Sequence, residues 1–515
     1  MKNDTKPTDN LQLIIEKQDQ KIAELEALVK WYEEQFRLAK HRQFGQSSEK
    51  TQPSDQIGLF DEAETTADRK NPEPELEEIT HTRKKRKGKR EEDLSGLPVN
   101  TVEHELPEDE RVCGECGGAM HSMGKETRRE LIIVPAQVSV TEHVRHVYSC
   151  RNCEKTADSV PIVKASMPEP VIKGSIASPT AIAHIMTQKY VTYTPLYRQE
   201  AEFIRQGISL SRQTMANWII KASEDWLEPI YERLRLRLLE HDVLHADETV
   251  LQVLQEPGRK ANTESYMWLY RTSGDAKHPI AMYEYQPTRS SSHPKRFLSG
   301  WSGYLHTDGY SAYHTLGGVT VVGCWAHMRR RFDEALKSMK PEERFCSNAQ
   351  KGLEYCNRLF RLESEAFADL PPDELHERRK EQSRPIAEEF FAWAQKLNVL
   401  PKTQIGKAIT YAIGQQEWLM NVYLDGRLEL SNNRAERSIK PFVMGRKNWL
   451  FCNTQNGARA SSVIYSIIET AKENGLKPFE YLKFLFEIMP NTTTANIENL
   501  LPWSDILPKC CMVGK

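Results

Sequence analysis

The first part of the chain carries apolar residues at an alternating spacing of four and three positions, without Pro or Gly, over residues 11–36. This series consists of Leu11, Ile15, Gln18, Ile22, Leu25, Val29, Tyr32 and Phe36, with Gln18 as its one polar member. The pattern predicts a leucine-zipper-like coiled coil over residues 1–45, through which the chain would form a homo-oligomer. The alternative is a single amphipathic helix that packs on its own protein.

Residues 46–98 are poor in apolar side chains and rich in charge, so we expect a disordered charged linker there. The linker contains a basic run, RKKRKGKR, at residues 83–90. These cations could bind DNA phosphates, or the run could simply be a solvated tether.

Residues 163–240 have a helical pattern that includes a helix-turn-helix-like pair at 195–205 and 211–222. The predicted core of this pair is Leu196, Ala201, Ile204, Ile208, Met215, Trp218 and Ile219. The outward-facing residues that could read bases in a major groove are Arg212, Gln213 and Asn217. A helical hairpin that makes no DNA contact is the alternative.

Short apolar runs typical of strands replace the helical pattern from residue 243 onward. We expect VLHADETVLQVL to form one strand up to Asp247 and a second strand after it. YMWLYRT and PIAMYEYQP supply further strands, GYLHTDGYSAYH a strand that ends at Asp308, and VTVVGCWAHMRRRF a last strand followed by a basic helix. Strands, a helix and further strands, with acids at strand ends, outline a ribonuclease-H-like domain.

The fold class that follows is multidomain α/β. The ribonuclease-H-like domain would occupy residues 241–470, with a charged, strand-poor helical insertion at about 333–425. Residues 471–515 would form a C-terminal helical segment.

Composition adds few limits on function. The chain has 515 residues and a formal net charge of −2, so any nucleic-acid binding must come from local basic patches. It has no run of about twenty apolar residues, so we expect no membrane span. Its first residues, MKNDTKPTDN, do not have the form of a secretory signal, and we expect a cytoplasmic protein.

Four of the ten cysteines form two pairs with the spacing C-x2-C-x33-C-x2-C. They are Cys113, Cys116, Cys150 and Cys153. Each pair can aim two thiolates at one tetrahedral ion, so residues 99–162 are predicted to form a zinc-ribbon-like module. Four thiolates leave no open coordination position, so this zinc would be structural; redox or chance pairing is the alternative.

The stretch LSNNRAERSIKPFVMGRKNWLF, residues 430–451, joins one acid to a basic, half-apolar helix. The polar turn at 431–433 is expected to cap the helix, which carries Glu436 in its first turns. The surrounding cations are Arg434, Arg437, Lys440, Arg446 and Lys447. This pattern suits a metal ligand beside a phosphate backbone, and equally an ordinary surface helix with a Glu–Arg pair.

Asp247, Asp308 and Glu436 would converge in a ribonuclease-H-like sheet. Carboxylates without softer ligands favour Mg²⁺ or Mn²⁺, and two such ions can promote phosphoryl transfer. Basic residues that could hold the substrate phosphates are Arg329, Arg330, Arg331, Arg437 and Lys440.

The blocks HADET, TDGYSAYH, CWAHMRRRF and SNNRAERSIKPFVMGRKNWLF resemble those of the insertion-sequence 66 family of bacterial DDE transposases, in its large subunit. The resemblance implies Asp247, Asp308 and Glu436 as the DDE triad and DNA ends of the element as substrate. It also implies two small accessory proteins as partners. An inert DNA-binding regulator and a structure-specific nuclease of the same fold are the alternative functions.

Several neighbours of the triad are assigned other roles. Glu248 would point to the opposite face of its strand and be structural. His245 and His306 share the strand face of the acids, and we expect them to pack rather than to line the site. Cys324 and His327 have ligand-like spacing without a partner pair, which makes zinc there improbable; His327 is a candidate phosphate or water contact.

Overall fold

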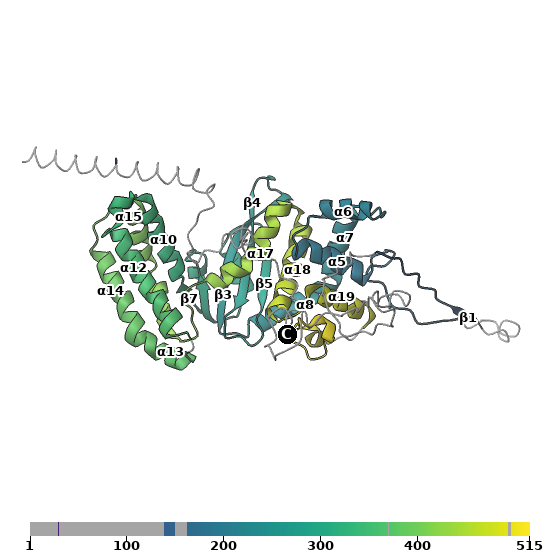
Figure 1. The fold of residues 1–515 in the computed structure, drawn as a ribbon. Helices are drawn as coiled ribbons and strands as arrows, with labels where there is room; N and C mark the ends of the chain where they lie inside the picture. The colour runs from purple at the N-terminus through teal and green to yellow at the C-terminus, as the bar shows by residue number, and fades with distance from the viewer. Residues whose placement is uncertain (1–28, 30–137, 150–161, 369, 493–495, 515) are drawn as a thin grey trace, which may run out of the picture. The chain divides into compact units, whose positions relative to one another are not determined.

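The computed structural model describes residues 29, 138–149, 162–368, 370–492 and 496–514 (Figure 1). The predicted coiled coil apart from Val29, the charged linker and the cysteines of the zinc-ribbon-like module lie outside these residues. The chain divides into two units, and the fold below is that of the described residues in the unit that contains 143–513.

One sheet of the order β5-β4-β3-β6-β7 forms the centre of this unit. Its strands are β3 (Val243–Gln255), β4 (Glu264–Thr272), β5 (Ala281–Gln286), β6 (Gly303–Thr307), β7 (Val319–Gly323) and β8 (Cys452–Thr454). The pairs β3–β4 and β4–β5 are antiparallel, whereas β3–β6 and β6–β7 are parallel, and β8 pairs in parallel with the far end of β3. A smaller antiparallel pair joins β1 (Val147–Ser149) and β2 (Ile162–Lys164).

The prediction of two strands in VLHADETVLQVL is wrong, because β3 is one strand of 13 residues. Its pairing with β4 continues without a break from Leu244 to Gln252. The acids in the middle do not end the strand because Glu248 has partners of its own: the Tyr313 hydroxyl and the Arg289 guanidinium bind its carboxylate. No Gly or Pro interrupts the run, so nothing in the backbone requires a turn.

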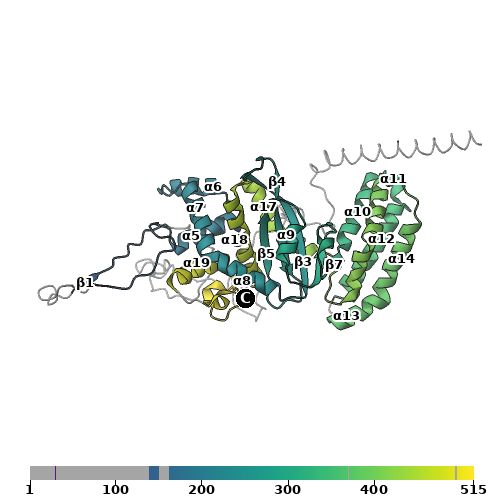
Figure 2. The same ribbon diagram turned by 180° about the vertical axis from the view of Figure 1, so that it is seen from behind.

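Alternation along the strands assigns the two faces of the sheet. Arg271 contacts Ser438 of helix α17 (Asn433–Trp449), whereas its neighbour Tyr270 stacks on Phe297 of α9 (Ser292–Phe297). Helix α18 (Gln455–Glu473) packs beside β5, with Ser466 accepting a hydrogen bond from the Tyr283 N–H (Figure 2). Asp247 pairs with Leu269 and therefore lies on the α17 face, whereas Glu248 lies on the α9 face.

Helices from both ends of this unit extend the same core. The N-terminal ones are α5 (Pro179–Tyr190), α6 (Leu196–Arg205), α7 (Arg212–Ala222) and α8 (Glu228–Leu238), and the C-terminal one is α19 (Pro478–Ile488). Helix α5 packs on α19, and the Tyr190 hydroxyl hydrogen-bonds the Ser461 hydroxyl of α18.

The α6–α7 pair has the expected turn, and Ser211 caps α7 by accepting from the Thr214 N–H. Met215, Trp218 and Ile219 are buried as expected, but Ile204 is 63% exposed, which corrects its place in the predicted core. The inward face of α6 carries Leu196, Gln199 and Phe203, and Ile204 falls one position beyond this series.

A second core holds a helical body that follows β7 directly. Its helices are α10 (Trp325–Ser338), α11 (Pro341–Arg344), α12 (Asn348–Arg361), α13 (Pro372–Arg378), α14 (Arg384–Lys396), α15 (Gln404–Gly414) and α16 (Gln416–Met420). Trp325 and Phe332 of α10 pack on Phe390 of α14. Among the described residues, none of the helices is both long and apolar enough for a membrane crossing.

Candidate active site

Asp247 lies on β3, half-buried, and its Oδ1 accepts a hydrogen bond of 2.8 Å from the Glu248 N–H. Burial raises the pKa of its carboxyl group well above the ordinary value, and the charges of Glu248, Asp308 and Glu436 raise it further. Carboxylates from three distant segments thus act on one another electrostatically. Asp308 and Glu436 therefore lie near enough to Asp247 for their charges to act on its carboxyl group.

Asp308 follows the last residue of β6, in a turn that its own side chain stabilises. Its Oδ1 accepts from the Tyr310 N–H at 3.0 Å, and its backbone carbonyl accepts from the Tyr411 hydroxyl of α15 at 2.9 Å. Gly309 has a φ of +91°, and a Cβ at this position would lie 2.8 Å from Oε1 of Gln415. The helical body therefore closes over the Asp308 turn and fixes its backbone.

Glu436 owes its position to Asn432, a fully buried residue at the start of α17. The Asn432 Nδ2 donates to the carbonyl of Ala246 at 2.8 Å, and its Oδ1 lies 3.0 Å from Nδ1 of His245. The Asn432 N–H also donates to Sγ of Cys324 at 3.1 Å. These contacts tie the first turn of α17 to the strand that carries Asp247.

The predicted capping role of the polar turn needs a correction. Helix α17 does begin at Asn433, with Asn432 at the cap position, but Asn432 makes no capping hydrogen bond through its side chain. The Asn432 side chain is instead bound to Ala246 and His245 of β3. The main-chain carbonyl of Asn432 accepts a hydrogen bond from the Glu436 N–H at 3.2 Å.

Glu436 faces two groups of α10. His327 Nδ1 lies 3.7 Å from its Oε1, and Arg330 Nη2 lies 3.3 Å from its Oε2. Oε1 of Glu436 and Nδ1 of His327 are buried atoms without a hydrogen-bond partner. One ligand atom each of Cys324, His327 and Glu436 lies within 4.8 Å of the others.

The side chains around Glu436 differ in their ability to bind a metal ion. Burial raises the pKa of the Cys324 thiol to about 11, so it stays protonated and is a poor ligand. Burial lowers the pKa of His327, so its ring is neutral and keeps a free lone pair. An orphaned carboxylate oxygen beside two further acids suits a divalent cation with oxygen ligands. The sequence spacing of Cys324 and His327 does not indicate that Glu436 lies beside them in the structure.

The basic residues predicted to contact phosphates lie on α10 and α17. Arg330 is paired with Glu436, Arg329 donates to Oδ1 of Asn357 at 2.7 Å, and Arg331 lies over the Tyr411 ring. On α17, Arg437 and Lys447 are exposed and Lys440 is partly exposed, whereas Arg446 is half-buried and bound to the Thr249 hydroxyl. Arg434 pairs with Glu429. On α7, the three predicted base readers, Arg212, Gln213 and Asn217, are exposed.

His245 and His306 pack as expected. Their rings stack with centroids 4.3 Å apart, and both side chains are fully buried. Burial lowers the pKa of His245 to about 3 and that of His306 well below its ordinary value, so both rings are neutral. Glu248 lies on the opposite face, as expected, paired with Arg289 and 1% exposed in its side chain.

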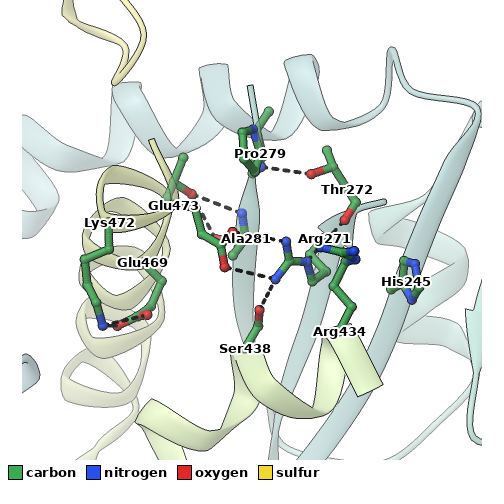
Figure 3. A network of polar contacts seen from close by, with 12 residues as sticks. His245, Arg271, Thr272, Pro279, Ala281, Arg434, Ser438, Glu469, Lys472 and Glu473 are labelled. Atoms are coloured by element: carbon green, nitrogen blue, oxygen red, sulfur yellow. Dashed lines mark hydrogen bonds and ion pairs between the residues drawn. The ribbon is translucent and has the colours of Figure 1, made fainter. Parts of the chain in front are cut away.

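A buried polar network that the sequence did not indicate holds α17 against the sheet (Figure 3). The Arg271 guanidinium of β4 binds the Ser438 hydroxyl of α17 and donates to Glu473 of α18 at 3.1 Å. Arg271 is 2% exposed, and its position within the apolar run YMWLYRT is the only sequence signal for this role.

Four family models match the chain. Residues 174–460 match the model described as "Transposase IS66 family", and residues 110–154 match "zinc-finger binding domain of transposase IS66". Residues 466–503 match "IS66 C-terminal element", and residues 31–102 match "Transposase C of IS166 homeodomain".

Two curated relatives are both named as uncharacterized proteins. The uncharacterized protein y4qI of Sinorhizobium fredii (strain NBRC 101917 / NGR234) is 30% identical, over 78% of this chain and 74% of the relative. The uncharacterized protein y4jD of the same organism is 31% identical, over 77% of this chain and 78% of the relative.

Proposed function

The chain belongs to the IS66 transposase family, and we propose that it is a DDE-type enzyme that cleaves and transfers DNA strands at the ends of a bacterial insertion sequence. The observation that supports this proposal is that the charges of Asp308, after β6, and Glu436, on α17, both act on the Asp247 carboxyl of β3. Strand order and direction support a ribonuclease-H-like fold for the domain: three antiparallel strands, then two parallel to the first.

The three acids would hold Mg²⁺ or Mn²⁺, since their oxygens suit hard cations and Oε1 of Glu436 lacks a partner. Such ions, when bound, supply activation of a water or 3′-hydroxyl and stabilisation of the leaving oxygen. The chain's own residues do the positioning: Asn432 holds α17 on β3, and Tyr411 holds the Asp308 turn. Arg330, bound to Glu436 in this structure, is close enough to bind a phosphate oxygen beside the acids.

DNA would be held by cations outside this centre. We assign phosphate contacts to Arg329, Arg330, Arg437, Lys440, Arg446 and Lys447, and base contacts to Arg212, Gln213 and Asn217. The half-buried position of Arg446 makes its contribution smaller than that of Arg437 or Lys447. The family match at residues 110–154 supports a structural zinc on Cys113, Cys116, Cys150 and Cys153. Self-association through residues 1–45 and two accessory proteins complete the proposal.

The test uses the purified full chain and duplexes that carry the DNA boundaries flanking its own gene. We expect nicked and joined products with Mg²⁺, none with EDTA, and none with duplexes whose terminal sequence is shuffled. Cleavage that ignores the terminal sequence would assign a nuclease instead. Sequence-specific binding without cleavage under any divalent ion would assign an inert regulator.

A further inference from the structure

Helix α17 ends in a strained two-residue turn that exposes apolar side chains. Leu450 has φ +66° and ψ −52°, and the Phe451 N–H donates to the Trp449 carbonyl at 2.9 Å. This hydrogen bond over two residues closes a γ-turn of the rare, strained kind. Leu450 is 63% exposed and Phe451 is 42% exposed, so burial of these side chains does not explain the strain.

Both sides of the turn are anchored. The Trp449 ring packs edge-on against Phe442, with centroids 5.6 Å apart, and Phe442 is fully buried. On the other side, Cys452 begins β8 and pairs with Val253 of β3. The apolar tip, defined as Leu450 and Phe451, therefore projects from a rigid base.

The tip lies at the end of a basic stripe. Arg437, Lys440 and Lys447 follow one another at intervals of three and seven residues, which places them along one side of α17, and the tip begins at the residue after the helix ends. The chain has no acidic residue between Glu436 and Glu469. The stripe thus begins next to Glu436, and every charged residue of the sequence from there to the tip is basic. Such a stripe is complementary to an anionic partner.

We propose that Leu450 and Phe451 form a wedge that inserts into the base stack of the DNA bound along α17. Proteins that deform DNA use such exposed apolar wedges, and an aromatic ring offers a face on which an unstacked base can rest. Glu436 and Leu450 are separated by about 21 Å of helix at 1.5 Å per residue. This length corresponds to roughly six base pairs at 3.4 Å each, so the wedge acts about six base pairs from the reacting phosphate. The inference rests on the proposed function, because the DNA is that of the candidate active site.

The experiment places 2-aminopurine, a base whose fluorescence rises when it is unstacked, at successive positions of a duplex carrying the element end. The protein carries Asp308→Asn, so that the complex forms without cleavage. We expect a several-fold rise at one or two positions about six base pairs from the cleavage point. Adding Leu450→Gly and Phe451→Ser should abolish the rise, while Phe451→Tyr, which keeps the ring, should preserve it.

The fold of the test variant and one control variant make the result interpretable. Leu450→Gly is compatible with the turn, since Gly adopts positive φ without strain, so loss of the fold is not expected. Ile506→Ser removes another exposed apolar side chain, from the C-terminal segment, and should leave the fluorescence profile unchanged. A profile that is the same with and without the tip overturns the wedge, even where the parent protein cleaves the same end. Failure of the parent protein to cleave that end counts against the proposed function instead.

Discussion

Nδ2 of Asn432 lies 2.8 Å from the carbonyl oxygen of Ala246, the residue that precedes Asp247. One buried amide thereby couples the helix of Glu436 to the strand of Asp247. The distance between the two acids depends on this contact, because Glu436 lies in the first turn of the same helix.

Replacing Asn432 with Ala should lower both stability and activity. It leaves the Ala246 carbonyl without this donor in a buried place, at a cost of about 1–3 kcal/mol in the free energy of unfolding. Strand cleavage should fall by about a hundredfold, since misplacement of Glu436 by about 1 Å has effects of that size. Denaturant unfolding and a cleavage assay measure the two effects. Asn448→Ala, an exposed position on the same helix, should be close to neutral in both.

Tyr411 gives a second prediction, which concerns the helical body. Tyr411→Phe removes the hydroxyl that donates to the Asp308 carbonyl and should cost about 1 kcal/mol of stability. Cleavage should fall by about tenfold or more, because the turn that carries Asp308 loses a constraint. Tyr355→Phe, which removes a hydroxyl bound to Glu389 in the same helical body, is the matched control. Equal activity in the two variants would show that the helical body does not position Asp308.

These contacts mark the limit of what the sequence could predict. The sequence suggests the three acids as a triad because each follows or interrupts an apolar run or opens a basic helix. The Tyr411–Asp308 hydrogen bond joins residues 103 positions apart, and no local pattern encodes it. The sequence places Asn432 in a polar turn at a helix start. That its side chain binds β3 and does not cap the helix depends on tertiary packing. The sequence pattern predicts two strands where β3 is one, because the partners of Glu248 come from distant segments.

Leu450→Gly should stabilise the protein. A non-glycine residue at φ +66° is strained, and glycine relieves that strain, by about 1 kcal/mol. We expect a higher midpoint in thermal or denaturant unfolding for this variant alone. A lower midpoint would mean that the Leu450 side chain contributes more to packing than its exposure indicates.

The zinc prediction is one tightly held ion per chain on Cys113, Cys116, Cys150 and Cys153. Cys113→Ser should release the zinc and destabilise residues 99–162, because metal binding and folding are coupled in such modules. Elemental analysis gives the stoichiometry, and limited proteolysis gives the local stability. Cys346→Ser, at an exposed cysteine outside the module, should keep the full zinc content. A parent protein purified without chelator and free of zinc would contradict the assignment.

The most direct measurement of the central claim compares DNA binding and strand cleavage in Asp308→Asn and Glu436→Gln. Each change keeps the size of the side chain and removes one carboxylate charge, so both variants should fold and bind the element end about as well as the parent. Both should lose cleavage and strand transfer under Mg²⁺ by several orders of magnitude, because residues that act as one unit do not replace one another. Asp225→Asn, a surface acid paired with Lys221, should keep full activity. Cleavage that survives in either triad variant, with binding intact, would contradict the assignment of Asp247, Asp308 and Glu436 as the catalytic centre.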